Sequence, residues 1–300
     1  MPPSQIVIRP PVEGASMSVL IPVTGGCSWN RCRFCGTYKG MYGIEQDYEI
    51  RPLEDVKRDV DYYAENNYHG FPVFLAGGNP TSAPTDYLVD IIKYVRFKLK
   101  AVPRVSCYAK ALDILRKSDE ELKKLANVGL DIVYMGLESG SSKILRLMRK
   151  GTNAESMIRA GKKVLNAGIK LSLYVILGLG GKKHSEEHVK ETARVLSEIN
   201  PTIFRFRTLN IVPFSELWDE WKSGDFELLT PVENLIEERE IIANLTENVT
   251  SQMFNDHMSN YIDIETENIK TDKENIIKVL DLLINNPKIQ NLPRRNLTRM

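Results

Sequence analysis

Three cysteines near the start of the chain have the spacing of a metal-binding loop. Cys27, Cys32 and Cys35 form a C-x4-C-x2-C pattern that one tight loop can aim at a common point. Thiolates are the usual ligands of iron–sulfur clusters and of structural zinc. A closed zinc site needs four protein ligands, and no nearby histidine or cysteine supplies the fourth. Three ligands on a four-iron cluster leave one iron open, so the pattern favours a reactive iron–sulfur centre.

The rest of the chain must position this loop, and its pattern predicts six βα units. Short apolar runs rich in β-branched residues alternate with segments of helical period, which is typical of a parallel sheet covered by helices. The predicted strands are Ser18–Thr24, Pro72–Ala76, Pro103–Tyr108, Asp131–Leu137, Lys170–Leu177 and Thr202–Asn210. The predicted helices are Leu53–Asn67, Thr85–Leu99, Asp119–Asn127, Ser142–Met148, Ala154–Asn166 and Ser185–Ile199.

Unusual residues follow or end these strands. The cysteine loop follows the first strand, and the second strand is followed by Gly77, Gly78 and Asn79. The third strand ends at Cys107, the fourth ends with Glu138 and Ser139, and the fifth is followed by Gly178. Right-handed crossovers bring the carboxyl ends of parallel strands to one face, where barrel active sites are built. The sequence therefore predicts an active site at these strand ends.

We expect four segments along the chain. They are a lead-in over residues 1–16, a core barrel over 17–230, a helical extension over 231–286 and a flexible tail over 287–300. Two long amphipathic helices, Val232–Met253 and Lys273–Asn285, are expected in the extension without further strands.

Composition narrows the function classes. Forty basic residues against 39 acidic ones give a formal charge of +1, so no global field indicates a nucleic-acid partner or an anionic membrane. The amino terminus lacks a secretory pattern and no stretch has the 18 or more apolar residues of a membrane span, so we expect a cytoplasmic protein without membrane contact. Four cysteines are too few for a disulfide scaffold.

The cysteine loop, with Phe34 directly before Cys35, resembles that of the radical S-adenosylmethionine (SAM) superfamily. The usual family spacing is C-x3-C-x2-C, and this loop is one residue longer. The motifs after the second and fourth strands resemble the oxygen-independent coproporphyrinogen oxidase-like and methylthiotransferase-like groups. The resemblance implies a partial (β/α)6 TIM-like barrel of parallel strands with a helical C-terminal extension. It also implies a single [4Fe–4S] cluster on Cys27, Cys32 and Cys35, with SAM bound at the open iron.

The resemblance further assigns expected SAM contacts. The methionine amino group would contact Gly77, Gly78 and Asn79, and the methionine carboxylate would contact Lys150 or else Arg149. The ribose hydroxyls would contact Glu138 and Ser139, and the adenine would contact Leu177 and Gly178. Phe34 would contact the cofactor beside the cluster. Each has a plainer interpretation. The glycine-rich runs are also turn signals, the acid also suits a helix amino terminus, and the basic pair also suits a solvated helix end.

Further candidates lie outside these motifs. Arg205 and Arg207 alternate with phenylalanines, so the two arginines share one face of a strand. If that face lines the barrel interior, they contact the substrate or SAM; otherwise they are surface arginines in solvent. Cys107 is either a small buried hydrophobe or a residue facing the substrate. His257 lies in a polar His-x-Ser-Asn-Tyr turn that resembles an element of another radical SAM branch, and it is either functional or a loop cap.

The resemblance implies reductive cleavage of SAM to a 5′-deoxyadenosyl radical, which abstracts hydrogen from a small or carrier-presented substrate. An electron donor such as flavodoxin or ferredoxin would reduce the cluster. Two other interpretations stay open: an iron–sulfur electron-transfer protein without SAM chemistry, and a zinc-binding scaffold.

Overall fold

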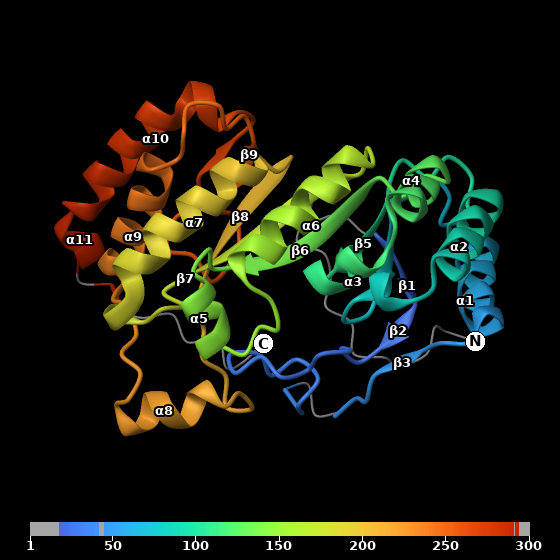
Figure 1. Ribbon diagram of the computed structural model, residues 1–300, viewed down its shortest axis with the longest axis horizontal. Helices are drawn as coiled ribbons and strands as arrows, with labels where there is room; N and C mark the ends of the chain where they lie inside the picture. The colour runs from blue at the N-terminus through green and yellow to red at the C-terminus, as the bar shows by residue number, and fades with distance from the viewer. Residues whose placement is uncertain (1–17, 42–44, 291, 294–300) are drawn as a thin grey trace. The chain divides into compact units, whose positions relative to one another are not determined.

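The computed structural model describes residues 18–41, 45–290 and 292–293, which form helices and strands of an α/β fold (Figure 1). The chain divides into two compact units. The first comprises residues up to 30 with 37–135 and 160–171, and the second comprises 31–36, 136–159 and the residues from 172 onward. The expected lead-in over 1–16 and most of the expected tail lie outside the described residues.

The first unit carries the amino-terminal strands and their crossover helices. Its strands are β1 (Val19–Pro22), β2 (Thr24–Gly25), β3 (Glu49–Ile50), β4 (Val73–Ala76), β5 (Val105–Ala109) and the first part of β6 (Ile132–Glu138). Its helices are α1 (Leu53–Glu65), the short η1 (Pro80–Ser82), α2 (Thr85–Lys98), α3 (Ala111–Arg116), α4 (Asp119–Asn127) and the end of α6 (Ala154–Asn166). Strands β1, β4, β5 and β6 pair in parallel, and β2 with β3 forms an antiparallel pair.

Aromatic side chains on three neighbouring strands fill the core of the first unit. The rings of Phe74 and Tyr108 pack edge to face with centroids 4.9 Å apart. Tyr134 lies 5.9 Å from the first ring and 6.1 Å from the second. Such pairs add to the free energy gained by burying the rings. They therefore favour the register in which Tyr108 lies opposite Tyr134.

The second unit carries the later strands and the C-terminal helices. Its strands are the end of β6, most of β7 (Lys170–Leu177), β8 (Ile203–Thr208), β9 (Gln252–Phe254) and β10 (Glu265–Thr266). Its helices are α5 (Ser142–Leu147), the start of α6, the short η2 (Lys182–His184), α7 (Ser185–Ile199), α8 (Leu217–Ser223), α9 (Pro231–Ala243), α10 (Ile269–Ile284) and α11 (Pro287–Gln290). Strands β7, β8 and β9 pair in parallel and β10 pairs antiparallel with β9.

The strand order confirms the predicted α/β class. Eight strands are hydrogen-bonded in the order β1-β4-β5-β6-β7-β8-β9-β10, and the first six are the six strands expected from the sequence. The six expected helices are also present as α1, α2, α4, α5, α6 and α7. Local signals explain some of the boundaries. Ser118 with Glu121, and Thr230 with Glu233, form capping boxes that start α4 and α9.

Some expected boundaries are wrong. Strand β5 continues to Ala109, so Cys107 does not end it. The helix expected over Val232–Met253 ends at Ala243, and the two short strands β9 and β10 follow it. Such short strands have no readable period, since their pairing comes from neighbouring strands. Within the expected tail, α11 is helical.

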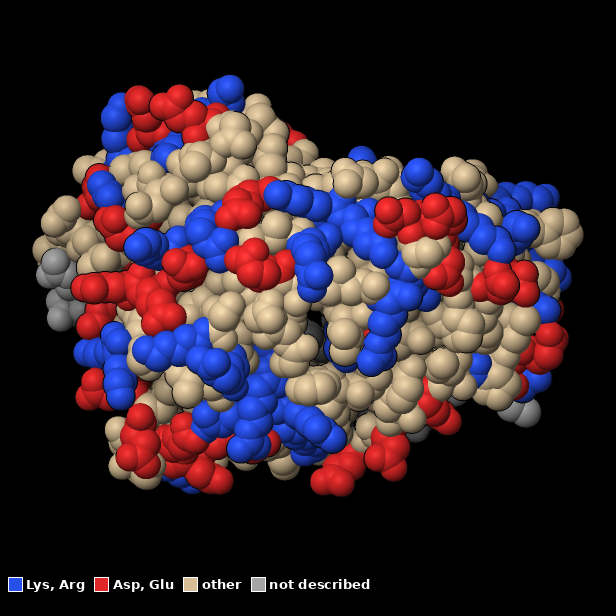
Figure 2. Space-filling model, in the orientation of Figure 1, with Lys and Arg blue, Asp and Glu red and all other residues tan. Residues whose placement is uncertain are grey.

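Basic and acidic side chains are interspersed over the face shown in Figure 2, in keeping with the formal charge of +1. Among the described residues, no helix combines the length and the apolar character needed to cross a bilayer.

Glu238 gives a test of how α9 packs. This side chain is 1% exposed and accepts a hydrogen bond from Asn255 Nδ2 at 2.6 Å. Burial raises its pKa from 4.5 to about 8, although the Asn255 hydrogen bond lowers it. The stability that Glu238 contributes is therefore fully present below pH 4.5 and is lost as the pH rises through 8. Between these limits the loss is on the order of 5 kcal/mol.

We expect Glu238→Gln to abolish this part of the pH dependence, so that the variant gains stability relative to the parent as the pH rises. Urea unfolding at several pH values measures it, and Glu247→Gln, at an exposed position, is the control. Parallel pH profiles for the Glu238 variant and the parent would show that the carboxyl is not buried as described.

Candidate functional site

The first part of the cysteine loop is fixed by backbone contact with the turn after β4. The amide of Gly78 donates to the carbonyl of Gly26 at 2.9 Å. A Cβ atom at Gly78 would lie 2.3 Å from that oxygen and 2.6 Å from the Cα of Cys27. At Gly77, where φ is +126°, a Cβ would lie 2.2 Å from Thr24 Oγ1. Only glycine allows so close an approach, so these two positions determine where Cys27 lies in the first unit.

Asn79 binds the same loop with its side chain. Its Oδ1 accepts from the amide of Ser28 at 3.0 Å, and its Nδ2 donates to Ser28 Oγ at 2.8 Å and to Asp113 Oδ2 at 2.6 Å. Lys110 Nζ also donates to Ser28 Oγ, at 3.0 Å. Asn79 is fully buried, and these bonds leave its amide a single acceptor lone pair. Its side chain therefore orients the residue after Cys27.

The second part of the cysteine loop lies in the second unit, where α5 and α8 hold it. The amide of Arg33 donates to the carbonyl of Met148 at 3.0 Å, and the carbonyl of Arg33 accepts from the amide of Leu217 at 3.0 Å. Within the loop, the amide of Cys35 donates to the carbonyl of Cys32 at 3.2 Å. These bonds define the turn between the two thiols.

Phe34 anchors this turn to the apolar core. Its ring packs against a buried cluster made of Ile144, Met148, Leu179, Leu209, Ile211 and Leu217. The ammonium of Lys150 lies 5.9 Å from the centre of the ring, within the range of a cation–π contact. Phe34 therefore links the cysteine turn to the charged residue expected to bind the SAM carboxylate.

Glu138 and Lys150 form a buried ion pair at the end of β6. Lys150 Nζ lies 2.6 Å from Glu138 Oε1, and the two side chains are 17% and 12% exposed. Glycine at position 136 makes room, because a Cβ there would lie 2.0 Å from Glu138 Oε1 and 2.7 Å from Lys150 Nζ. Glu138 itself has φ +62°, an uncommon value for a residue other than glycine and one that points to a functional constraint.

The charge of Lys150 is stabilised by its surroundings. Burial by itself lowers the pKa of its ammonium, but the charge of Glu138 and its hydrogen bond, together with the nearby Cys32 and Cys35, raise it, so the pKa lies above its usual value. Arg149, the other basic candidate, is 61% exposed and its Nη1 lies 2.7 Å from Glu216 Oε2. Only Lys150 of the two is buried beside Glu138.

A buried polar network holds the ends of β6 and β7. His188 Nδ1, from α7, lies 2.8 Å from Ser139 Oγ, and His188 Nε2 lies 3.6 Å from Glu237 Oε1 of α9. Glu237 accepts from the amide of Gly178 at 2.5 Å and from the hydroxyl of Ser185. Burial lowers the pKa of His188, and the Glu237 carboxylate only partly offsets this, so the imidazole is neutral near pH 7. Ser139 thus positions the strand end, with its hydroxyl bound inside the protein.

Neither His188 nor Glu237 is marked by a motif in the sequence. The one available signal is that His188 shares the buried face of α7 with Thr192, Leu196 and Ile199. A histidine on such a face must find polar partners inside the protein, because burial without them costs free energy.

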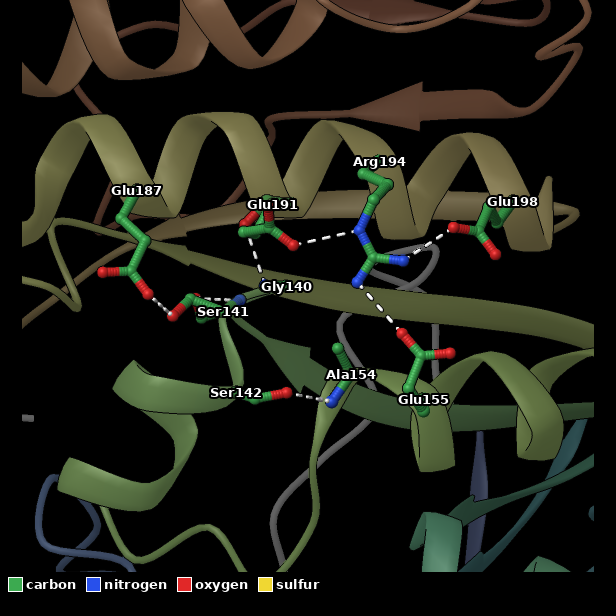
Figure 3. A network of polar contacts seen from close by, with 11 residues as sticks. Gly140, Ser141, Ser142, Ala154, Glu155, Glu187, Glu191, Arg194 and Glu198 are labelled. Carbon is green, nitrogen blue, oxygen red and sulfur yellow. Dashed lines mark hydrogen bonds and ion pairs between the residues drawn. The ribbon is translucent and has the colours of Figure 1, made fainter.

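Helix α7 also binds the turn that links β6 to α5 through its side chains (Figure 3). The amide of Gly140 donates to Thr192 Oγ1 at 2.9 Å, and Ser141 Oγ donates to Glu187 Oε1 at 2.5 Å. Farther along the helix, Arg194 forms ion pairs with Glu155, Glu191 and Glu198. The turn carrying the Glu138 motif is therefore fixed from one side by a single helix.

The backbone expected to meet adenine is occupied by the protein. The carbonyl of Leu177 accepts from the amide of Leu209 at 2.9 Å, and the carbonyl of Gly178 accepts from the amide of Gly181 at 2.9 Å. The amide of Gly178 donates to Glu237. The polar backbone groups of Gly178 are therefore already bonded, and a Cβ there would lie 3.1 Å from Asn234 Oδ1.

The two arginines of β8 differ in their partners. Arg205 Nη1 lies 2.6 Å from Asp256 Oδ1, and its guanidinium lies 4.4 Å from the centre of the Phe254 ring. Arg207 lies 4.4 Å from the centre of the Tyr174 ring, and its buried Nε and Nη2 have no hydrogen-bond partner within the described part of the chain. Arg207 is thus the better candidate for an anionic ligand.

The structure gives Cys107 and His257 plain environments. Cys107 is 1% exposed in β5, and burial raises the pKa of its thiol to about 12, as in a core residue. His257 Nδ1 lies 2.7 Å from Ser259 Oγ and accepts from the Ser259 amide at 3.2 Å, as in a loop cap.

The donor set suits an iron–sulfur cluster. None of the four cysteines is disulfide-bonded, and Cys27, Cys32 and Cys35 are partly exposed. Cys27 belongs to the first unit, whereas Cys32 and Cys35 belong to the second. Within the described ranges, no three His, Cys, Asp or Glu side chains are already gathered as a metal site. The ligand set therefore rests on residue type, spacing and the loop contacts above.

Gly78→Ala tests the contact that fixes Cys27. The added methyl group must displace the cysteine loop, which we expect to cost about 1–3 kcal/mol. Iron and sulfide bound after anaerobic reconstitution should fall, while circular dichroism stays that of a folded protein. Gly168→Ala is the control for lost stability alone. Nothing lies within 4 Å of a Cβ there, but its φ of +84° strains an alanine, so this variant should lose stability and keep full cluster loading. Full cluster loading in the Gly78 variant would contradict the contact.

Glu237→Ala tests the network at the strand ends. The buried amide of Gly178 and the Ser185 hydroxyl both lose their acceptor, so the free energy of unfolding should drop by about 2–5 kcal/mol in denaturant titrations. Glu240→Ala, on the same helix, removes a carboxylate that is 42% exposed and should cost less than about 1 kcal/mol. Equal losses in the two variants would show that the network contributes nothing specific.

Comparison with known proteins identifies the family. The model of the radical SAM superfamily matches residues 21–196, more than half of the 300-residue chain. The chain is similar to an uncharacterized protein of Methanocaldococcus jannaschii, at 25% identity over 75% of this chain and 70% of that protein. It is also similar to tRNA-2-methylthio-N(6)-dimethylallyladenosine synthase of Chlorobium chlorochromatii, at 28% identity over 63% of this chain and 41% of that enzyme.

Solved structures agree on the fold. Coproporphyrinogen III oxidase of Escherichia coli, a radical SAM enzyme, superposes with a TM-score of 0.55 at 19% identity, over 75% of this chain and 51% of that one. The chain thus spans about half the length of that enzyme and less than half of the tRNA-modifying one. The likeness confirms the expected fold class of a partial (β/α) barrel. On the family match, this chain belongs to the radical SAM superfamily, whose enzymes bind a [4Fe–4S] cluster and SAM.

Proposed function

We propose that the protein reductively cleaves SAM to a 5′-deoxyadenosyl radical, which abstracts a hydrogen atom from a substrate. The observation that carries the proposal is the buried Glu138–Lys150 pair, in which one anion and one cation lie 2.6 Å apart at a strand end. SAM carries a carboxylate, an ammonium group and ribose hydroxyls, so a carboxylate and an ammonium placed together complement its charges and donors.

Cys27, Cys32 and Cys35 are the residues that would hold the cluster. The bound cluster would supply one electron to the sulfonium of SAM, whose C–S bond then breaks to give methionine and the 5′-deoxyadenosyl radical. The protein's part is to bind and orient SAM and to exclude water and oxygen. Phe34 and the apolar residues around it provide such a surface directly beside Cys35.

Lys150 and Glu138 change partners when SAM binds. The ammonium of Lys150 is already charged and meets the methionine carboxylate, and the Glu138 carboxylate accepts hydrogen bonds from the ribose hydroxyls. Before SAM binds, each ion keeps the other satisfied, because a buried charge without a partner is costly. The glycine at position 136 leaves the space that the two charged groups occupy while they are paired.

The side chain of Asn79, in the turn after β4, has a different role from the SAM contact that the resemblance suggests. Asn79 is committed to Ser28 and Asp113, which leaves one acceptor lone pair for a ligand. We assign the contact with the methionine ammonium to the backbone of Gly77 and Gly78, and the orientation of the cysteine loop to Asn79.

The reaction needs a one-electron donor, for which a flavodoxin or ferredoxin is suitable, and a substrate that is small or presented by a carrier. An iron–sulfur electron-transfer protein that ignores SAM is the second candidate. It is favoured only by the cysteine loop, which both functions share.

The test is anaerobic SAM cleavage. The reconstituted protein is reduced with dithionite and given SAM, and 5′-deoxyadenosine is followed by chromatography. We expect product from the parent and none from Cys32→Ala. Lys150→Met should weaken SAM binding about tenfold or more, since a charge-assisted hydrogen bond is lost. Arg149→Met, at the adjacent exposed residue, is the matched control and should bind SAM as the parent does.

Lys150→Met leaves the Glu138 carboxylate unpaired and can therefore destabilise the fold. The double variant Glu138→Gln/Lys150→Met removes that unpaired charge, so weak SAM binding by the folded double variant shows that the loss of affinity is not caused by unfolding. A cluster whose spectrum SAM does not perturb, together with no product, would replace the proposal by the electron-transfer interpretation.

A further inference from the structure

A cavity of about 220 Å³ lies at the carboxyl ends of β7 and β8 in the second unit. Gly178, Asn210, Trp218, Trp221, Asn234 and Tyr261 are among the residues that line it. The absent side chain of Gly178, which has φ +77°, contributes to the opening. Typical ligand pockets measure roughly 300–1,000 Å³, so this cavity suits one ring system rather than a whole extended ligand.

Asn234 presents an unused acceptor to this cavity. Its side chain is 3% exposed, and its Nδ2 donates to the carbonyls of Thr230 at 2.9 Å and Leu229 at 3.5 Å. These two bonds fix the orientation of the amide, so the oxygen faces away from the helix backbone. Asn234 Oδ1 has no hydrogen-bond partner among the residues that the structure describes. It lies 3.1 Å from where a Cβ of Gly178 would be, which places it at the cavity wall.

Two tryptophans make another part of the cavity wall aromatic. The rings of Trp218 and Trp221 have centroids 5.1 Å apart and planes inclined by 53°. Trp218 also packs against the apolar cluster that contacts Phe34. The ammonium of Lys222 lies over one face of Trp218, 4.7 Å from the ring centre. The remaining indole faces can bind a planar ring by stacking, and a buried acceptor beside them selects rings that carry an N–H group.

The position of the cavity in the sequence separates it from the shared machinery of the family. The superfamily model matches residues 21–196, whereas every lining residue named above except Gly178 lies between 210 and 261. The region common to all members must serve the cofactors that all members bind. Residues beyond it that do not support the strand ends, as Glu237 does, are therefore free to adapt this chain to its own substrate.

We infer that this cavity binds the substrate through a planar nitrogen heteroaromatic ring whose N–H donates to Asn234 Oδ1 while the ring stacks on the tryptophans. The inference rests on the proposed function, since it names the substrate class for the same active site.

Two probes that differ by one hydrogen-bond donor test it. Benzimidazole carries a ring N–H, and 1-methylbenzimidazole has the same ring without it. Binding of each to the reconstituted full-length protein is measured by ligand-observed NMR and tryptophan fluorescence. We expect benzimidazole to bind about tenfold more tightly than its methylated form, and Asn234→Leu to remove that difference. Trp221→Leu, at a residue that is 36% exposed and so tolerant of change, should weaken both probes.

SAM titrations on the same samples distinguish the ring of a substrate from the adenine of SAM. Unchanged SAM affinity in Trp221→Leu and in saturating benzimidazole supports a substrate cavity. Competition between benzimidazole and SAM would overturn the inference, because the cavity would then be the site of the SAM adenine. Equal binding of the two probes would also overturn it, because the ring N–H would then have no hydrogen bond to Asn234. Probe binding needs no SAM cleavage, so N–H-dependent binding without 5′-deoxyadenosine would count against the proposed function alone.

Discussion

Parallel strands deliver their carboxyl ends to a common edge, and the hydrogen bonds between them fix which residues arrive there. Within the first unit, the strand ends are followed by Cys27 and the Gly77–Asn79 turn. Within the second unit, taken by itself, Glu138 ends β6, Gly178 follows β7 and the loop toward α8 follows β8. A strand shifted by one residue would turn each side chain to the opposite face. The placement of the chemistry therefore depends on the registers set by buried strands.

Two buried polar side chains perform the same task in the two units. Asn79 holds the backbone and hydroxyl of Ser28, and Glu237 holds the backbone of Gly178. In both cases a backbone amide at a strand-end loop receives an acceptor from a distant part of the chain. Buried amides must be paired, so these contacts make each loop adopt one conformation. Rigidity of this kind is what a site for radical chemistry needs, because reactive intermediates are controlled by position.

The two proposed sites, one for SAM and one for the substrate, are built from different parts of the chain. Glu138 and Lys150, the charges that we propose complement SAM, lie within the residues matched by the superfamily model, whereas the aromatic cavity is built mainly from residues after them. Gly178 belongs to both parts, because its amide is tied to Glu237 and its missing side chain opens the cavity. On these proposals, the choice of substrate can change through α8 and α9 while the strands expected to serve the cofactors keep their registers.

The sequence by itself determined the six βα units and the glycines after β4, and it marked the three cysteines that we propose as cluster ligands, because each has a local signature of period, spacing or conformational freedom. Tertiary structure decided which polar groups meet. Lys150 rather than Arg149 is buried beside Glu138, Asn79 bonds to Ser28, and His188 and Glu237 support the strand ends. It also added β9 and β10, too short to show a period. Such contacts join residues far apart in the chain, and only burial of the surrounding apolar faces brings them together.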